Sequence, residues 1–230
     1  MCEIDEMYEK VLRRVSNFMV VALALADEQV PKVPEPEKSG CNKPLMVIGP
    51  SAVGKDTMLN RLKAKYPKVI YKLPSYTTRP KREGEIDGVD YYFVTKEEFF
   101  KLRDDGELFG IQEYNGNWYA SNKTRLEEAL KDENKITVLN YNINTANAVK
   151  DEISFNFVAV LPPSEAALKE RLIKRKTKAE EILKRMENSI KEIQLINEAN
   201  YIQYRLVNDK EEEAYNKLER HLQKIYPQLH

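Results

Sequence analysis

The chain has 230 residues, and its 37 lysines and arginines balance its 37 aspartates and glutamates. A formal net charge of zero gives no strong positive field, so we expect neither a nucleic-acid-binding protein nor one held on an anionic membrane. The apolar runs are too short to span a bilayer. Cys2 and Cys41 fit no metal-ligand spacing and are typical of free thiols in a reducing compartment, so the sequence predicts a cytoplasmic globular protein.

The segment 1–43 differs in pattern from the rest of the chain. Apolar side chains recur there at helical spacing and predict an amphipathic helix over 5–26. A proline-rich, charged stretch over 31–40 is typical of a linker. We expect this appendage to precede one domain over 44–230. Two roles for the helix stay open, because it could pack on that domain or contact a protein partner or a second copy.

A glycine-rich loop lies between an apolar run and an amphipathic stretch. The run Leu45–Ile48 predicts a buried strand, and Met58–Tyr66 predicts a helix. In the loop, glycines let consecutive N–H groups point at phosphate oxygens, the helix N-terminus adds its positive end, and Lys55 adds a point charge. This order predicts a nucleoside triphosphate site made by Gly49, Pro50, Ser51, Ala52, Val53, Gly54, Lys55, Asp56 and Thr57.

Asp56 departs from the usual form of this motif. The position after Gly-Lys normally carries Ser or Thr, whose hydroxyl binds magnesium. A carboxylate is also a hard oxygen ligand of the kind that Mg²⁺ prefers. We therefore expect Mg²⁺ to accompany the triphosphate, with Asp56 as its candidate ligand. The alternative is that Asp56 pairs with a nearby cation or stabilises the start of the helix.

Beyond this loop, strands and helices alternate along the chain. The runs 136–139 and 155–161 are apolar, and the first is free of charge, as parallel strands buried on both faces are. Ser164 is a good N-cap for a helix through Arg175. The alternation predicts an α/β fold with a parallel sheet flanked by helices. Further strands are expected at 69–73 and 205–208, and further helices at 179–199 and 211–226.

The stretch 75–125 breaks this alternation and predicts a small mixed α/β insert. Short strands are expected at 90–94, 109–114 and 118–119, and Asn115-Gly116 is a strong hairpin turn signal between the last two.

The entrance of the insert carries an arginine-rich and tyrosine-rich run. Arg79 and Arg82 can fork onto one phosphate, and tyrosine hydroxyls can complete its shell. The insert thus predicts a site for a phosphorylated acceptor beside the triphosphate site. A solvated, charge-rich turn is the alternative.

Taken together, these motifs resemble the guanylate kinase family. The resemblance covers Pro44 to His230 in the family's order and is more specific than the phosphate loop alone. It is carried by Gly49-Pro50-Ser51, Gly54-Lys55, Thr77-Thr78-Arg79-Pro80, Arg82, Gly84-Glu85, Gly88, Asp90-Tyr91, Gly116-Asn117-Trp118-Tyr119, Pro162-Pro163-Ser164 and Val207-Asn208-Asp209.

The resemblance implies transfer of the γ-phosphoryl group of ATP to GMP with Mg²⁺, with a helical lid over about 174–185. It implies catalytic roles for Lys55, Arg79, Arg175 and Arg185, and contacts to ATP from Arg171 in the lid region and from Asn208 at the adenine. It implies that the acceptor is held by Ser75, Arg79, Arg82, Glu85, Tyr91, Tyr119, Ser121 and Asn142, with Glu85 organising the arginines and Ser75 and Ser121 touching the guanine.

Three positions depart from that resemblance where guanine and the metal are expected. The family places a glutamate at the position of Gly110 and aspartates at the positions of Asn140 and Asn142. Each lost charge-assisted hydrogen bond removes about 1.5–3 kcal/mol of binding. We therefore expect weaker selection of GMP, and we expect restored carboxylates at 110 and 142 to sharpen it.

Two alternatives to a nucleoside monophosphate kinase stay open at this point. One is a guanylate-kinase-like binding or scaffold domain with little catalysis, which the N-terminal helix and the lost carboxylates favour. The other is a kinase of the same fold that acts on a phosphorylated sugar, which the Gly-Lys-Asp sequence favours.

Overall fold

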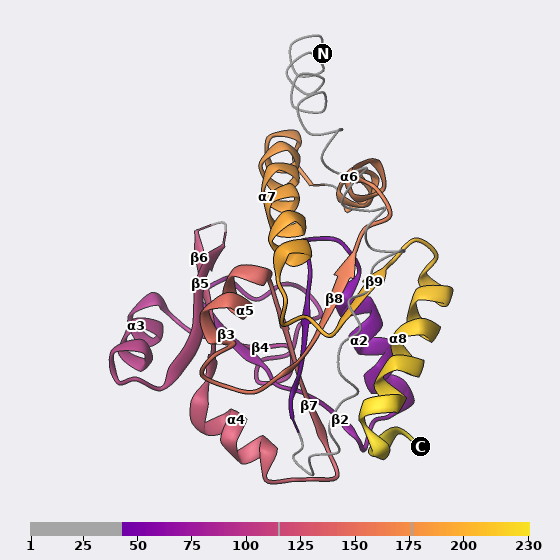
Figure 1. The fold of residues 1–230 in the computed structure, drawn as a ribbon. Coiled ribbons are helices and arrows are strands. Elements are labelled where there is room, and N and C mark those ends of the chain that lie inside the picture. Colours follow the sequence, from indigo (N-terminus) through magenta and orange to yellow (C-terminus); the bar gives the residue numbers. More distant parts are fainter. Residues whose placement is uncertain (1–42, 115, 176) are drawn as a thin grey trace.

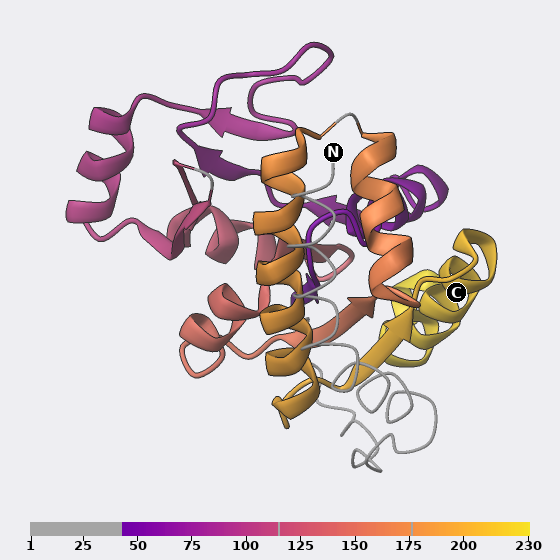
Figure 2. The same ribbon diagram turned by 90° about the horizontal axis from the view of Figure 1, so that it is seen from above.

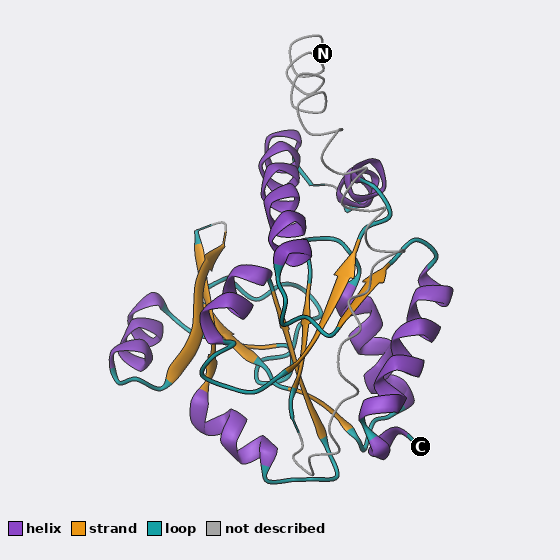
Figure 3. Cartoon of the chain, in the orientation of Figure 1, coloured by secondary structure: helices purple, strands orange, loops and turns teal. Residues whose placement is uncertain are grey.

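The computed structural model describes residues 43–114, 116–175 and 177–230. The helix expected over 5–26, the linker after it, Cys2 and Cys41 lie outside these ranges. Two sheets dominate the described part, with helices on both sides of the larger one (Figures 1 and 3). None of the described helices is long and apolar enough to cross a bilayer.

The larger sheet is entirely parallel, as expected from the alternation of strands and helices. Its strand order is β2-β7-β1-β8-β9, so β1 is central, with β7 on one side and β8 on the other. All five strands point their carboxyl ends to one edge, which is where such sheets bind ligands. The strands are β1 (Leu45–Ile48), β2 (Ile70–Lys72), β7 (Ile136–Tyr141), β8 (Asn156–Leu161) and β9 (Tyr204–Val207).

Helices cover both faces of this sheet, and each face has its own apolar core. Leu62 of α2 and Leu218 of α8 are fully buried against one face, and Ile143 of α5 and Ile196 of α7 against the other. Leu126 of α4 joins the second core. The helices are α2 (Lys55–Lys65), α4 (Lys123–Leu130), α5 (Ile143–Val149), α7 (Ala179–Glu198) and α8 (Glu211–Ile225), followed by a short 3-10 turn (Pro227–Leu229).

The smaller sheet occupies the stretch where the alternation breaks. Its order is β4-β3-β6-β5, with β3 parallel to β4 and β6 antiparallel to both β3 and β5. The α3 helix covers it, and Phe99 of α3 is fully buried there. Its elements are β3 (Ser75–Thr77), β4 (Tyr91–Phe93), α3 (Lys96–Asp104), β5 (Leu108–Tyr114) and β6 (Asn117–Asn122).

Two helices project beyond the carboxyl edge of the larger sheet. They are α6 (Glu165–Lys174) and the first half of α7, and Figure 2 shows them side by side. Ser164 caps α6 as expected, since its hydroxyl accepts a hydrogen bond from the N–H of Ala167 at 3.1 Å. Leu168 and Leu172 of α6 pack with Ile182 and Met186 of α7, which joins the two helices into one unit.

Candidate active site

A cleft of about 520 Å³ opens between the carboxyl edge of the larger sheet, the smaller sheet and the α6–α7 pair. It brings together most of the residues that the sequence singled out. From that set it is lined by Gly49, Ser51, Ala52, Lys55, Asp56, Ser75, Arg79, Arg82, Tyr91, Tyr119, Asn142, Arg175 and Arg185. Pro50, Val53, Gly54, Thr57, Glu85, Ser121, Arg171 and Asn208 are not among the lining residues.

The loop after β1 has a backbone that few sequences can adopt. Gly49 has φ +150°, and a Cβ there would lie 2.2 Å from the carbonyl oxygen of Val160, so only glycine fits. Gly54 has φ +105° and abuts the amide of Asn208. Ala52 has φ +63°, a conformation that non-glycine residues rarely adopt and that stores strain. The loop is therefore shaped for a ligand rather than for its own stability.

Two side chains hold this loop from behind. Asn208 donates a hydrogen bond to the carbonyl oxygen of Val53 at 2.8 Å, and Arg171 donates to the same oxygen at 3.1 Å. Arg171 also donates to the backbone oxygen of Asn208 at 2.6 Å. The sequence placed both side chains against ATP, whereas these contacts fix the loop that would bind it. The Oδ1 atom of Asn208 is buried without a hydrogen-bond partner among the described residues.

Lys55 folds back over the loop that precedes it. Its ammonium donates to the carbonyl oxygens of Gly49 at 2.5 Å and of Pro50 at 3.0 Å. Burial lowers its pKa, and the nearby Glu192 partly opposes that shift. Glu192 belongs to α7, and burial raises its pKa to about 7 even though Lys55 acts in the other direction. A lysine and a carboxylate thus face each other at the base of the cleft.

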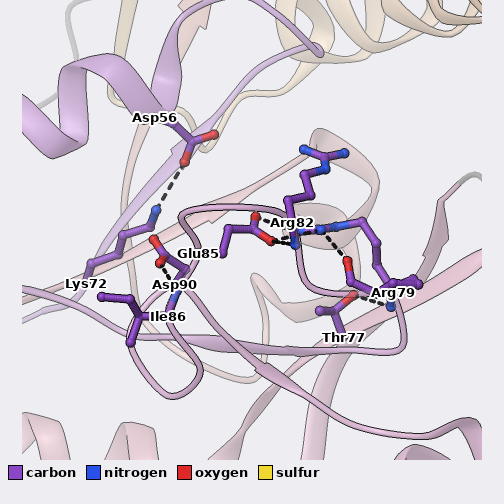
Figure 4. A network of polar contacts seen from close by, with 9 residues as sticks. Asp56, Lys72, Thr77, Arg79, Arg82, Glu85, Ile86 and Asp90 are labelled. Carbon is purple, nitrogen blue, oxygen red and sulfur yellow. Dashed lines mark hydrogen bonds and ion pairs between the residues drawn. The ribbon is translucent and has the colours of Figure 1, made fainter.

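Asp56 stands at the first turn of α2, between two polar partners from the larger sheet. Its Oδ1 accepts a hydrogen bond from the amide of Asn140 at 2.8 Å. The same oxygen lies 3.2 Å from the ammonium of Lys72, a contact that Figure 4 shows. Partial burial acts to raise the pKa of Asp56, but Lys72 and Lys55 outweigh it and hold that pKa below its usual value. The carboxylate is therefore ionised beside the phosphate loop.

An arginine pair is organised at the far side of the cleft. Glu85 accepts two hydrogen bonds from the Arg79 guanidinium, at 2.7 and 3.0 Å, and one from the backbone N–H of Arg82 at 2.8 Å. The hydrogen bonds from Arg79 hold the pKa of Glu85 below its usual value. The guanidinium of Arg82 points away from Glu85 (Figure 4) and lines the cleft. The rings of Tyr91 and Tyr119 meet edge to face beside Arg79.

Hydroxyls and amides make the wall of the cleft between β3, β5 and β7. The amide of Asn142 donates to Gln112 Oε1 at 2.6 Å, and the Tyr141 hydroxyl donates to Ser121 at 2.6 Å. Ser121 is fully buried and lies 3.4 Å from Ser75, oxygen to oxygen. The Tyr141 side chain lines the cleft, whereas Ser121, expected to touch a ligand, does not.

The α6–α7 pair adds two arginines and an acid to the cleft. Arg175 follows the last turn of α6, and its positive charge contributes to the lowered pKa of Lys55. Arg185 pairs with Glu181 one turn earlier on α7 at 3.1 Å. Lys55, Arg175 and Arg185 thus converge on one space, where their charges suit a polyphosphate.

The sequence did not single out seven further lining residues: Lys72, Leu73, Gln112, Tyr114, Tyr141, Glu181 and Glu192. Glu192 had a visible signal, because it shares the helical face of Ile182, Met186, Ser189 and Ile196, where a carboxylate interrupts an apolar stripe. Gln112 and Tyr141 had no such signal, because the residues near them in the sequence do not reveal which strands β5 and β7 pair with.

Comparisons with known proteins show which family this chain resembles. The family model described as guanylate kinase matches residues 41–225. A guanylate kinase of Clostridium perfringens strain 13 is 37% identical over 177 residues, which are 76% of this chain and 80% of that protein. A guanylate kinase of Schizosaccharomyces pombe is 38% identical over 179 residues, 77% of this chain and 88% of that protein.

A solved structure is also similar. The crystal structure of guanylate kinase from Anaplasma phagocytophilum superposes with a TM-score of 0.60 at 26% identity, covering 81% of this chain and 87% of that one. The likeness therefore extends over both sheets rather than over the phosphate loop alone.

Proposed function

The chain belongs to the guanylate kinase family, and on that premise we propose that it transfers the γ-phosphoryl group of ATP to GMP, giving ADP and GDP. One observation carries the proposal at the level of the site. A single cleft holds the lysine of a phosphate loop on one side and an arginine pair, braced by a carboxylate, on the other. That is the arrangement needed to bring a donor and an acceptor phosphate together.

On the donor side, the loop after β1 would hold the phosphates of ATP. Backbone N–H groups and the α2 N-terminus favour negative charge there. Lys55 would exchange its contacts with Gly49 and Pro50 for phosphate oxygens. Arg171 and Asn208 support this role indirectly, because they fix the Val53 carbonyl and with it the loop.

On the acceptor side, Arg79, Arg82, Tyr91 and Tyr119 would hold the phosphate of GMP. Glu85 fixes Arg79, so that its guanidinium needs little reordering when the phosphate binds. Arg175 and Arg185 would lie over the transferred group, where charge spreads in the transition state. The chain's contribution to the chemistry is therefore alignment and positive charge rather than a covalent step.

The residues at the mouth of the loop fit a magnesium ion bound with ATP. Asp56 is ionised, half-exposed and beside Lys55, and it has a second carboxylate oxygen beyond the one that contacts Asn140. Mg²⁺ in such sites takes one or two carboxylates and completes its shell with phosphate oxygens and water. Asp56 would hold the ion, which neutralises phosphate charge and orients the β- and γ-phosphates when bound.

The same observations favour catalysis over the two alternatives. A binding module has no need for Lys55, Arg175 and Arg185 to converge on one cleft. A kinase for a phosphorylated sugar is less well supported, because the relatives reported above are named guanylate kinase and match most of the chain.

A coupled assay of ADP release with ATP and GMP tests the proposal. Arg82→Ala removes a cation that faces the acceptor phosphate, so we expect the KM for GMP to rise roughly tenfold to a hundredfold while the KM for ATP changes little. Lys81→Ala, an exposed neighbour, is the matched control and should leave both values near those of the wild type. Absence of ADP release with every nucleoside monophosphate would overturn the proposal.

A further inference from the structure

Among the residues that the structure describes, the wall of the cleft that would face the base has no carboxylate. The acids in the lining are Asp56, Asp90, Glu181 and Glu192. Each is committed elsewhere: Asp56 contacts Lys72, Asp90 accepts from the N–H of Ile86, Glu181 pairs with Arg185, and Glu192 faces Lys55. The lining residues on β3, on β5 and at the end of β7 are Ser75, Gln112, Tyr114, Asn140, Tyr141 and Asn142, and the Asn140 amide is already bound to Asp56.

The amide of Asn142 has a fixed orientation. Asn142 is the N-cap of α5, and its Oδ1 accepts the N–H of Thr145 at 2.9 Å. A backbone N–H can only donate, so the atom facing it must be the oxygen, and the Nδ2 group faces the other way. That group donates to Gln112 Oε1 at 2.6 Å, which turns the NH₂ group of Gln112 outward as well. Both amides therefore keep N–H donors for a ligand.

A chain of hydroxyls ends in a third donor. The Tyr141 hydroxyl donates to Ser121, whose own proton is then free to go to Ser75, 3.4 Å away. Ser75 lines the cleft, and once it accepts that proton its own hydroxyl hydrogen turns toward the ligand.

A wall of uncharged donors selects a particular edge of a base. Guanine and hypoxanthine both present two acceptors, the C6 carbonyl oxygen and N7, on one edge. Adenine replaces the carbonyl with an amino group, which faces the same wall donor to donor. Guanine differs from hypoxanthine by the 2-amino group, a donor that a carboxylate would accept but that here faces the outward NH₂ group of Asn142, which is itself a donor.

We propose that the acceptor site takes 6-oxopurine nucleoside monophosphates as a class, through the C6 carbonyl and N7, and does not read the 2-amino group of guanine. The inference deepens the proposed function and rests on it for the placement of the acceptor. Its consequence is that IMP is accepted at least as well as GMP and that AMP is rejected.

Steady-state rates of the full chain with GMP, IMP and AMP test this directly. We expect kcat/KM for IMP to equal or exceed that for GMP, and that for AMP to be lower than either by roughly tenfold to a hundredfold. A preference for GMP over IMP of a hundredfold, or AMP used as well as GMP, would overturn the inference while leaving the proposed function standing.

Binding measurements separate the two claims. Calorimetric titration of GMP and of IMP into the protein saturated with a non-hydrolysable ATP analogue gives the same ratio without turnover. Equal binding without phosphorylation would sink the proposed function and keep this inference. Failure of both monophosphates to bind would overturn the inference too.

One isosteric substitution should restore guanine selectivity. In Asn142→Asp, one carboxylate oxygen keeps the cap on Thr145, and the other replaces the outward NH₂ group with an acceptor for the 2-amino group. We expect the GMP/IMP ratio to rise by about tenfold or more. Asn134→Asp adds the same charge at the opposite end of β7, outside the cleft, and should leave the ratio unchanged. An unchanged ratio in Asn142→Asp would contradict the orientation argued for the amides.

Discussion

At the scale of single residues, the surroundings of Gly110 oppose the introduction of a side chain at that position. Its φ is +61°, and a Cβ there would lie 2.9 Å from Thr145 Cγ2 and 3.4 Å from the Tyr141 hydroxyl. Tyr141 thus fills the space into which a longer side chain at 110 would extend. A glutamate at 110 could therefore sharpen guanine selection only if Thr145 shifts and the left-handed backbone is kept.

Gly110→Glu should destabilise the fold rather than improve it. Left-handed backbone and the contact with Thr145 together should lower the free energy of unfolding by about 2–4 kcal/mol. Urea unfolding measures the loss. Gly106→Glu is the matched control, since Gly106 has φ +74° with open space around its Cβ position, so it carries the backbone strain alone. Equal losses in the two variants would show that Tyr141 and Thr145 do not crowd position 110.

The phosphate end of the site was readable from the sequence residue by residue, whereas the base end was not. In the loop, Gly49, Gly54 and Lys55 owe their roles to a fixed local order of strand, turn and helix. Arg79, Arg82 and Glu85 lie within a few positions of one another, so their mutual contacts are local as well. The pairing of Asn142 with Gln112 joins two elements far apart in the chain, and no local pattern announces it.

At the scale of elements, the Asp56–Asn140 hydrogen bond connects the start of α2 to the end of β7. The resemblance implies an aspartate at the position of Asn140, and the structure places the Asp56 carboxylate 2.8 Å from the Asn140 amide. We therefore infer that Asp56 replaces the acid absent at Asn140. This position beside the phosphate loop therefore has one carboxylate, that of Asp56, which accepts a hydrogen bond from the Asn140 amide. Two carboxylates at that distance would repel each other, and one would hold a proton.

A double-mutant cycle tests whether a carboxylate at position 140 can take over the role of the carboxylate at position 56. Asp56→Ser alone should weaken magnesium-dependent binding of an ATP analogue roughly tenfold, because the ion loses its charged ligand. Adding Asn140→Asp should recover most of that loss, while Asn140→Asp alone should also weaken binding through repulsion. Fluorescence titrations over a range of Mg²⁺ concentrations give the four affinities. Additive effects of the two substitutions would disprove compensation.

Helices and strands were predictable where the spacing of apolar residues continued long enough to show a helical or strand period. The α7 and α8 helices, and the apolar strands β1, β7 and β8, match their predicted positions within a few residues. The shorter helices α3, α4 and α5 were missed, since few turns of apolar spacing fit into them and tertiary packing supplies much of their stability. For α3 a signal was present, the capping box from Thr95 to Glu98.

At the scale of the whole molecule, Glu192 makes the stability of the fold depend on pH. The folded chain holds its pKa near 7, against 4.5 for an unperturbed glutamate, because burial disfavours the charge. Between these values the unfolded chain releases a proton that the folded chain keeps. Stability therefore falls as pH rises from about 4.5 to about 7, and above that range the penalty stays constant.

Glu192→Gln should remove this penalty. We expect the variant to gain stability over the wild type at pH 8, by on the order of 3 kcal/mol, and to show little difference near pH 4.5. Thermal unfolding across this pH range measures the effect. Glu187→Gln changes an exposed acid of the same helix and should give a difference that does not vary with pH. A pH-independent gain in Glu192→Gln would show that Glu192 titrates normally.

The central place of β1 also has a consequence for the chain as it is synthesised. In the larger sheet β1 pairs with β7 and β8, and β7 begins only at Ile136. An apolar strand must therefore leave the ribosome long before its hydrogen-bonding partners exist. The β5–β6 hairpin pairs with a near neighbour in sequence and can form first. During this interval the nascent protein exposes an unpaired, aggregation-prone edge, so chaperone demand should peak before residue 136 is translated and fall once β8 has emerged.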